Sequence, residues 1–358
     1  MTKVLIVATS RKTRGGITSV IKAHETGEQW KKFHCHWIQT HRDGAAWRKI
    51  FYLAIAWIDY TMRLPFYDII HVHFSLRTTA SRKRPFVELA KLFRKKVIVH
   101  LHCGTQIDEI WNNNYYYLFD VADVSLFLSD CLRKKVMTYF SVKKDFRVCY
   151  NPSPKIMGHS FSRHQNIILF SGTLYLGKGY ADLIKAFARI AFKYPTWKIV
   201  FAGNGEIEQG KELAKSLQIE SQTVFLGWVS GQNKDEIFRQ ASVFCLPSYA
   251  EGFPMAVLDA WAYGLPVITT PVGGIPDVAI DGENMLLFNP GDIDMLAIQL
   301  ERMITNNRLR EHISAASYEF ANHKFNIDTI NQQLDDLYTE LSLSLIHISE
   351  PTRLDVIS

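Results

Sequence analysis

Residues 243–269 read VFCLPSYAEGFPMAVLDAWAYGLPVIT, and this stretch decides the fold. The apolar run Val243–Leu246 predicts a short buried strand. A turn follows, and Pro254 stands near the first position of a helix, where proline is favoured. Gly264 and the proline two residues later end this helix, and Pro266–Thr269 predicts a second strand. A strand, a helix and another strand in this order predict a βαβ unit with parallel strands.

The same alternation of strands and helices runs through both halves of the chain. The strands expected in the first half are Val4–Ala8, Asp68–Phe74, Lys96–His102 and Val124–Leu128. Those expected in the second half are Ile167–Phe170, Trp197–Ala202, Thr223–Leu226, Val243–Leu246, Pro266–Thr269 and Met285–Phe288. Residues 151–166, with two prolines and little periodicity, are typical of a linker. The 358 residues therefore predict an α/β chain of two doubly wound domains, 1–155 and 156–342, with the ligand between the carboxyl ends of both sheets.

The last residues of the chain carry an unusual sequence. Residues 343–353 read LSLIHISEPTR, which resembles the translation of a sequencing adapter. We therefore expect residues 343–358 to be a non-native tail and exclude them from the fold prediction.

The composition narrows the class of protein. Apolar residues make up 47% and charged residues 21%, which is typical of a soluble globular chain and excludes disorder. The five cysteines are scattered without a CxxC pair, which argues against a disulfide scaffold or a zinc module. No signal-peptide pattern opens the sequence, and the most apolar stretch, Ile50–Ile58, is too short to span a bilayer. We expect a cytoplasmic protein.

Charge is distributed unevenly along the chain. Residues 1–150 hold 25 Lys and Arg against 12 Asp and Glu, a net charge of +13, whereas the remainder has a net charge of −7. Each short run of basic residues, such as residues 82–84, 94–96 and 133–135, is by itself typical of a solvated surface. The total net charge of +13 nevertheless suggests an anionic partner. An anionic membrane leaflet and a phosphorylated acceptor both fit. Nucleic acid is not expected, because no basic motif interleaved with aromatic residues and no helix-turn-helix occurs.

The stretch 243–269 also carries candidate functional residues. The start of its helix offers free backbone N–H groups and the positive end of a dipole, which together bind anions. Glu251, in the turn before it, suits hydrogen bonds from the hydroxyl groups of a sugar. Asp259 lies about two turns further on and can face the same ligand. The alternative is that Glu251 only stabilises the helix dipole and that Asp259 faces solvent.

Other segments of the second half add to this pattern in a fixed order. They are the loop Phe170–Gly179, the glycine-rich turn Phe201–Gly205, the strand end Val224–Val229 and the segment Thr269–Val278. Together with Glu251 and a second carboxylate eight positions later, they resemble the GT-B glycosyltransferases of family 4. In the first half the resemblance rests on Gly15-Gly16, on His71-Val-His73 and on His102.

The resemblance implies a GT-B fold of two Rossmann-like domains and a retaining, nucleotide-sugar-dependent transfer with no cofactor and no divalent metal. No Asp-x-Asp metal motif occurs in the sequence, which agrees with this expectation. The residues implied as catalytic are His102, Lys178 and Glu251. The residues implied to bind the donor are Gly15, Gly16, Gly172, Thr173, Gly203, Asn204, Gly205, Gly252, Phe253, Pro254, Met255 and Asp259. Lys178 and helix N-termini would stabilise the negative charge that grows on the leaving diphosphate.

Two positions depart from the family pattern. Thr173 stands where an Arg usually follows the glycine of the phosphate loop, and Asp259 replaces the second Glu. A missing guanidinium removes a fork that would bridge two phosphates, whereas Lys178 supplies one point charge.

The sequence therefore predicts transfer of a sugar from a UDP-, GDP- or ADP-sugar to a polysaccharide or lipid-linked oligosaccharide of a bacterial surface. The first domain is expected to hold the acceptor, and its segment Trp47–Met62 is either a membrane-facing helix or a core helix. A nucleotide-sugar 2-epimerase of the same fold and a non-catalytic nucleotide-sugar binding protein remain as alternatives.

Overall fold

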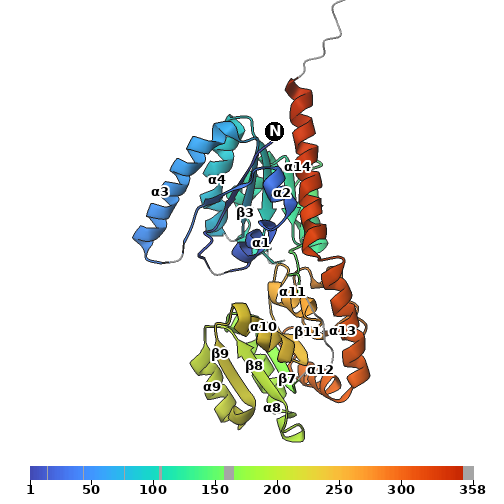
Figure 1. Ribbon diagram of the computed structural model, residues 1–358. Helices are drawn as coiled ribbons and strands as arrows, with labels where there is room; N and C mark the ends of the chain where they lie inside the picture. Colours follow the sequence, from blue (N-terminus) through green and yellow to red (C-terminus); the bar gives the residue numbers. More distant parts are fainter. Residues whose placement is uncertain (14, 43, 76, 105–106, 157–164, 350–358) are drawn as a thin grey trace, which may run out of the picture. The chain divides into compact units, whose positions relative to one another are not determined.

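The computed structural model describes residues 1–13, 15–42, 44–75, 77–104, 107–156 and 165–349. Within these ranges the chain forms two compact units, each with its own parallel sheet (Figure 1). The first unit contains residues 1–150 together with the segment from Ile327 onward. The second unit is Asn151–Asn326.

The sheet of the first unit has six parallel strands in the order β2-β1-β3-β4-β5-β6. These strands are β1 Val4–Ala8, β2 His36–Gln39, β3 Ile69–Phe74, β4 Lys96–Leu101, β5 Val124–Phe127 and β6 Phe146–Val148. The helices are α1 Gly16–His24, α2 Glu28–Lys32, α3 Ala46–Arg63, α4 Arg77–Leu92, α5 Ile107–Ile110, α6 Asn113–Val121, α7 Asp130–Met137 and α14 Ile327–Ser349.

Side chains alternate between the two faces of this sheet along each strand. Helices cover both faces, so both sets of side chains are buried. One face packs on α3, α4 and α6 through residues such as Tyr60 and Phe86. The other face packs on α1 and α14 through Ile21, Leu334 and Tyr338. Layers of helices on both faces of a parallel sheet are the doubly wound arrangement that the sequence predicts.

Helix α14 corrects the expected domain boundary. Residues up to 342 were assigned to the second domain, but α14 packs on the first unit through an apolar stripe that includes Ile330, Leu337 and Leu341. Two ion pairs join its polar side to the same unit, Asp335 to Lys32 at 2.6 Å and Glu340 to Arg147 at 2.7 Å. The helix also continues through residues 343–349 of the expected tail, and residues 350–358 lie outside the described residues.

This boundary changes the distribution of charge. The first unit, with the acidic residues from Ile327 onward included, has a net charge of +8, and the second unit has a net charge of −2. The first unit therefore remains basic, but less so than residues 1–150 alone.

The sheet of the second unit is also six-stranded and parallel, in the order β12-β11-β10-β7-β8-β9. The strands are β7 Ile167–Ser171, β8 Lys198–Ala202, β9 Thr223–Gly227, β10 Val243–Leu246, β11 Val267–Thr269 and β12 Leu286–Leu287. The helices are α8 Tyr180–Ala188, α9 Ile207–Ser216, α10 Gly231–Gln240, α11 Met255–Ala262, α12 Ile293–Thr305 and α13 Asn307–Asn322. The two doubly wound sheets confirm the predicted fold class.

All ten strands expected from the sequence are present, to within one residue at each end. The sequence analysis missed β2 and β6, which have four and three residues and are too short to show a clear period. Over the described residues, every helix is too short or too polar to cross a membrane.

Candidate functional site

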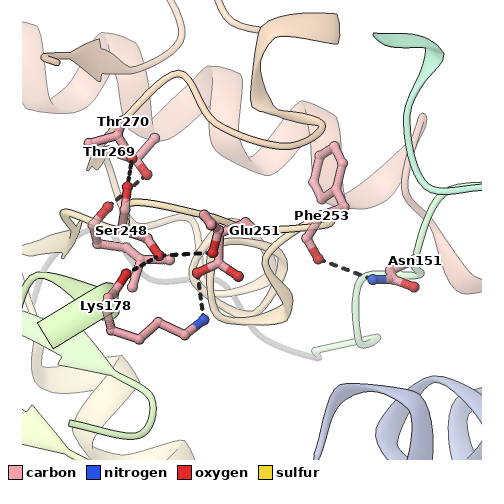
Figure 2. Close-up of polar contacts among 10 residues, drawn as sticks. Asn151, Lys178, Ser248, Glu251, Phe253, Thr269 and Thr270 are labelled. Carbon is pink, nitrogen blue, oxygen red and sulfur yellow. Dashed lines mark hydrogen bonds and ion pairs between the residues drawn. The ribbon is translucent and has the colours of Figure 1, made fainter. Parts of the chain in front are cut away.

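Lys178 and Glu251 form an ion pair in the second unit (Figure 2). The Lys178 Nζ lies 2.5 Å from the Glu251 Oε1, and the Glu251 side chain is only 10% exposed. Lys178 follows β7 and Glu251 follows β10, and these strands are parallel neighbours in the sheet. The carboxyl ends of neighbouring parallel strands meet at one edge, so the fold brings together two of the residues that the sequence analysis singled out.

Close backbone contacts hold the loops that carry this pair. Gly179 has a φ of 72°, and a Cβ there would lie 2.0 Å from the Pro247 carbonyl oxygen, so a side chain would push the loops apart. The Tyr249 amide donates to the Gly177 carbonyl at 2.9 Å. The buried Thr270 hydroxyl donates to the Ser248 carbonyl at 2.5 Å (Figure 2). The ion pair therefore rests on a rigid loop scaffold.

The predicted glycine-rich turns after β7 and β8 pack against each other. A Cβ on Gly203 would lie 1.7 Å from the Gly172 carbonyl oxygen, and one on Gly205 would lie 2.2 Å from the Leu174 carbonyl oxygen. The Asn204 side chain accepts a hydrogen bond from the Trp228 amide at 2.8 Å. These residues therefore shape the loop edge of the sheet through their backbones.

Gly172 and Thr173 lie in the loop after β7, which the family resemblance assigns to the donor phosphates. Gly172 has a φ of 148°, which favours glycine, and a Cβ there would meet nothing closer than 4.0 Å. The side chain of Thr173 is exposed. Thr173 therefore leaves the space around this position unoccupied, and it does not supply the positive charge that an Arg has there in the family pattern.

The segment Gly252–Met255 leads into α11, which begins at Met255 with Pro254 before it. The Gly252 carbonyl accepts from the Gly274 amide at 2.6 Å, which fixes the turn. Phe253 is a core residue: its ring is 2% exposed and packs on Phe325 at a centroid distance of 4.8 Å. The role predicted for Phe253 in donor binding is thus limited to its backbone, because its side chain points into the protein interior.

Asp259 pairs with a residue that the sequence analysis missed. Its Oδ2 lies 2.7 Å from the Nζ of Lys234 on α10, and its side chain is 15% exposed. Burial raises the pKa of Asp259, and the Lys234 ammonium opposes this shift. No sequence motif pointed to Lys234, because the contact depends on how α10 and α11 pack. Asp259 is thus not the solvent-facing carboxylate of the alternative interpretation.

We expect Asp259→Ala to raise the KM for the donor more than it changes kcat, because the family resemblance implies that Asp259 holds the donor equally in the ground and transition states. Asp259→Glu restores the family's usual residue and should keep most of the affinity if Lys234 still reaches the carboxylate. Steady-state kinetics over a range of donor concentrations measures this. A fall in kcat at unchanged KM would show that Asp259 acts in the transition state instead.

His102 lies in the first unit, one residue beyond β4. Its amide donates to the Phe74 carbonyl at 2.8 Å, and its Nε2 lies 2.9 Å from the Nδ1 of His73. Desolvation lowers the pKa of His102 to about 3, so the ring is neutral near pH 7. His73, which belongs to a motif that carries the family resemblance, is therefore a direct neighbour of His102.

His102 belongs to a row of histidines on one face of the first sheet. His71 and His73 are two positions apart on β3, so their side chains lie on the same face of the sheet. His100 lies opposite His73 on the neighbouring strand β4. Among the described residues, only His71, His73 and His100 form a group able to hold a metal ion, with ligand atoms within 4.8 Å of one another. All three are buried, and burial lowers the pKa of each below its usual range. The sequence predicts no metal, and this group lies in the sheet core, where the Tyr338 hydroxyl lies 2.8 Å from the Nδ1 of His71.

Gly15 and Gly16 stand at the start of α1 in the first unit. Gly15 has a φ of 156°, and nothing lies within 4 Å of a Cβ built there. Among the side chains the structure describes, none caps the N-terminus of α1 with a hydrogen bond. This open helix start has the backbone geometry that the sequence analysis assigned to an anion site.

Comparisons with known proteins identify the family that the second half of the chain resembles. Residues 155–320 match the family model described as glycosyl transferases group 1. An uncharacterized glycosyltransferase of Haemophilus influenzae is 31% identical over 170 residues, which is 47% of this chain and 48% of that protein. The N-acetyl-alpha-D-glucosaminyl L-malate synthase of Bacillus anthracis is 26% identical over 294 residues, 76% of this chain and 75% of that protein. The chain thus spans about half the length of the first relative and three quarters of the second.

The fold comparison covers nearly the whole chain. The crystal structure of Anabaena HepE in complex with UDP-glucose has a TM-score of 0.76 and 18% identity, and the match covers 95% of this chain and 100% of that one. At this identity the likeness concerns the fold alone. The match over residues 155–320 contains Lys178, Glu251 and Asp259. Residues 155–320, which include these three residues, are therefore similar to the glycosyl transferases of group 1.

Proposed function

We propose that the protein is a retaining glycosyltransferase that moves a sugar from a nucleoside-diphosphate donor to a hydroxyl of a lipid-linked oligosaccharide. Synthesis of a capsule, an exopolysaccharide or an O-antigen is the process that this reaction would serve. The Lys178–Glu251 pair supports the proposal most strongly, because it lies at the carboxyl edge of the second sheet within the family match.

The chemistry follows from the charges at that edge. The bond from the sugar C1 to the diphosphate oxygen breaks, and its electron pair remains on the β-phosphate. The acceptor oxygen bonds to C1 from the same face, and its proton passes to the departing phosphate oxygen. The Lys178 ammonium stabilises the growing negative charge, and the N–H groups of the first turn of α11 add to this.

Glu251 has two roles in this proposal. In the free protein it holds the Lys178 ammonium at 2.5 Å, which orients that group before the donor arrives. An ammonium has three donors, so Lys178 can keep its bond to Glu251 and still donate to a phosphate oxygen. The second carboxylate oxygen of Glu251 is then available to accept from a sugar hydroxyl.

We propose that the transfer needs no divalent metal, because a cationic side chain and backbone N–H groups take the place of the ion. Activity should therefore persist in excess EDTA. A loss of activity that Mg²⁺ or Mn²⁺ restores would refute this prediction.

A panel of UDP-, GDP- and ADP-sugars tests the proposed function against its alternatives. A transferase releases the nucleoside diphosphate, slowly with water and faster with an acceptor. An epimerase instead equilibrates the sugar at C2 without net loss of donor, and a binding protein does neither. Nucleotide release with an unchanged sugar supports the proposal, and either other outcome refutes it.

An anionic membrane is the second partner that we propose, and α3 in the first unit supports it. Its inner side buries Ala56 and Tyr60. Its outer side bears large apolar residues that are each at least 46% exposed, namely Trp47, Ile50, Phe51, Ile55, Ile58 and Met62. Exposed Arg48 and Lys49 flank this apolar stripe. A helix with an exposed apolar stripe and basic flanks suits the interface of an anionic bilayer.

We expect binding to phosphatidylglycerol vesicles to rise with the share of anionic lipid and to fall with salt. The double substitution Phe51→Ser, Ile58→Ser should weaken binding at least tenfold, because two apolar side chains no longer enter the interface. Phe192→Ser, at an exposed apolar residue of the second unit, is the control and should bind normally. Vesicle sedimentation that is insensitive to lipid charge, salt and the α3 substitutions would refute membrane docking.

A further inference from the structure

Lys83, on α4 of the first unit, is a buried cation that pairs with no carboxylate of the described residues. It is 3% exposed, and its Nζ donates to the Thr40 hydroxyl. No carboxylate of the described residues pairs with it, and the hydroxyl occupies only one of its three N–H donors. Lysines are almost never fully buried unless they are paired. This burial therefore calls for a partner that the described residues do not supply.

Arg82 places a second cation beside the first. Its Nη1 lies 2.7 Å from the Nδ1 of His41, and its Nε donates to the Thr78 carbonyl at 3.0 Å. Arg82 is half-buried and forms no ion pair with a described residue. Desolvation lowers the pKa of Lys83, and the adjacent Arg82 charge lowers it further. The two cations therefore repel each other where little water is present to screen them. A bound anion beside them would reduce this repulsion and stabilise the folded protein.

These cations lie near the carboxyl ends of the strands of the first sheet. Thr40 follows β2, and its amide donates to the carbonyl of Ala8 at the end of β1, at 2.8 Å. The Ser10 amide donates to the His41 carbonyl at 2.7 Å, which joins the loops after β1 and β2. Ligands of doubly wound sheets bind outside the carboxyl ends of the strands.

We propose that Arg82 and Lys83, with His41, bind a phosphate group of the acceptor substrate. This inference rests on the proposed function, and it takes the link between the lipid and the oligosaccharide acceptor to be a diphosphate. The half-buried Arg82 guanidinium contacts the phosphate directly, since its fork suits two phosphate oxygens. Lys83 adds a fixed positive charge behind it, with two donors not used by Thr40.

The test uses the full chain and soluble pyrophosphate as the probe. Lys178→Ala is the background in every sample, so that the donor site does not bind the probe. Arg82→Gln, Lys83→Met and the exposed control Lys22→Met are compared by titration calorimetry, and by melting temperature with and without pyrophosphate.

We expect pyrophosphate to bind the background protein and the Lys22→Met control, and to raise their melting temperatures. Arg82→Gln should weaken binding at least about tenfold, as expected for loss of a hydrogen bond to a charged group. Lys83→Met should also weaken it, yet raise the melting temperature without pyrophosphate by about 2–4 °C, because an uncompensated buried charge is replaced by an apolar side chain.

The proposal is overturned if the background protein does not bind pyrophosphate, or if Arg82→Gln binds it as tightly as the control. It is also overturned if Lys83→Met lowers the melting temperature and leaves binding intact, since Lys83 is then only structural. If Lys83→Met does not fold, the affinity of Arg82→Gln decides. Failure of the proposed function is read separately, from the donor panel with the unmodified protein.

Discussion

Replacing Lys178 with alanine should lower kcat by about 10²-fold or more, the usual loss when a preorganised charge that stabilises a transition state is removed. In the proposed mechanism, the negative charge that Lys178 stabilises develops as the bond between the sugar and the diphosphate breaks. Its loss should therefore change kcat more than the KM for the donor. Steady-state rates of nucleotide release measure both quantities.

The ion pair adds a second effect that a control must separate. Without Lys178, Glu251 is left as a carboxylate that is 10% exposed and unpaired, which destabilises the second unit. Lys178→Arg keeps the charge and should keep more activity than Lys178→Ala. Lys185→Ala removes an exposed lysine of α8 and should change neither kcat nor KM. An unchanged kcat in folded Lys178→Ala would show that the phosphate loop is assigned wrongly.

The first unit should lose stability as the pH falls from 7.5 to 5. Burial lowers the pKa of His24 from its ordinary value of 6.5 to about 4, and the pKa values of His71, His73, His100 and His102 are also lowered. The unfolded chain then binds more protons than the folded chain. Stability is therefore full above about pH 6.5 and is lost as the pH falls towards the folded-state values. His24 alone accounts for about 2 kcal/mol of this loss at pH 5.

Urea unfolding at several pH values measures this effect. His24→Gln removes one buried titrating group and should flatten the pH dependence below pH 6.5. His312→Gln removes an exposed histidine and should leave the pH dependence as it is. Equal unfolding free energies at pH 7.5 and pH 5 would contradict the burial of neutral histidines in this sheet.

The two sheets, and Lys178 and Glu251 as candidate site residues, could be predicted because they depend on local patterns; the ion pair between the two residues was not predicted. Apolar runs mark the strands, and both residues lie in segments that follow strands which turn out to be neighbours. The order of the strands in the sequence does not show which strands are neighbours in the sheet. In any parallel sheet, however, residues that follow the strands lie at the same edge. The candidate site therefore followed from the family resemblance together with the placement of its residues after strands.

Other features depend on contacts between distant segments, which no local pattern records. The apolar stripe of α14 indicates that the helix is buried, but not that it packs on the first unit through Leu334 and Tyr338. Lys234 meets Asp259 only because α10 and α11 pack together. Phe253 matched a donor-binding motif, whereas its ring belongs to the core with Phe325.

The donor site is tested most directly by comparing nucleoside diphosphates with the corresponding nucleosides, which lack phosphate. We expect UDP, GDP or ADP, whichever matches the donor, to raise the melting temperature of the wild-type protein by mass action, and the nucleoside to have little effect. Lys178→Ala should lose most of this shift, and Lys185→Ala should retain it. An equal shift in the wild type and in Lys178→Ala would contradict binding of the donor diphosphate at Lys178.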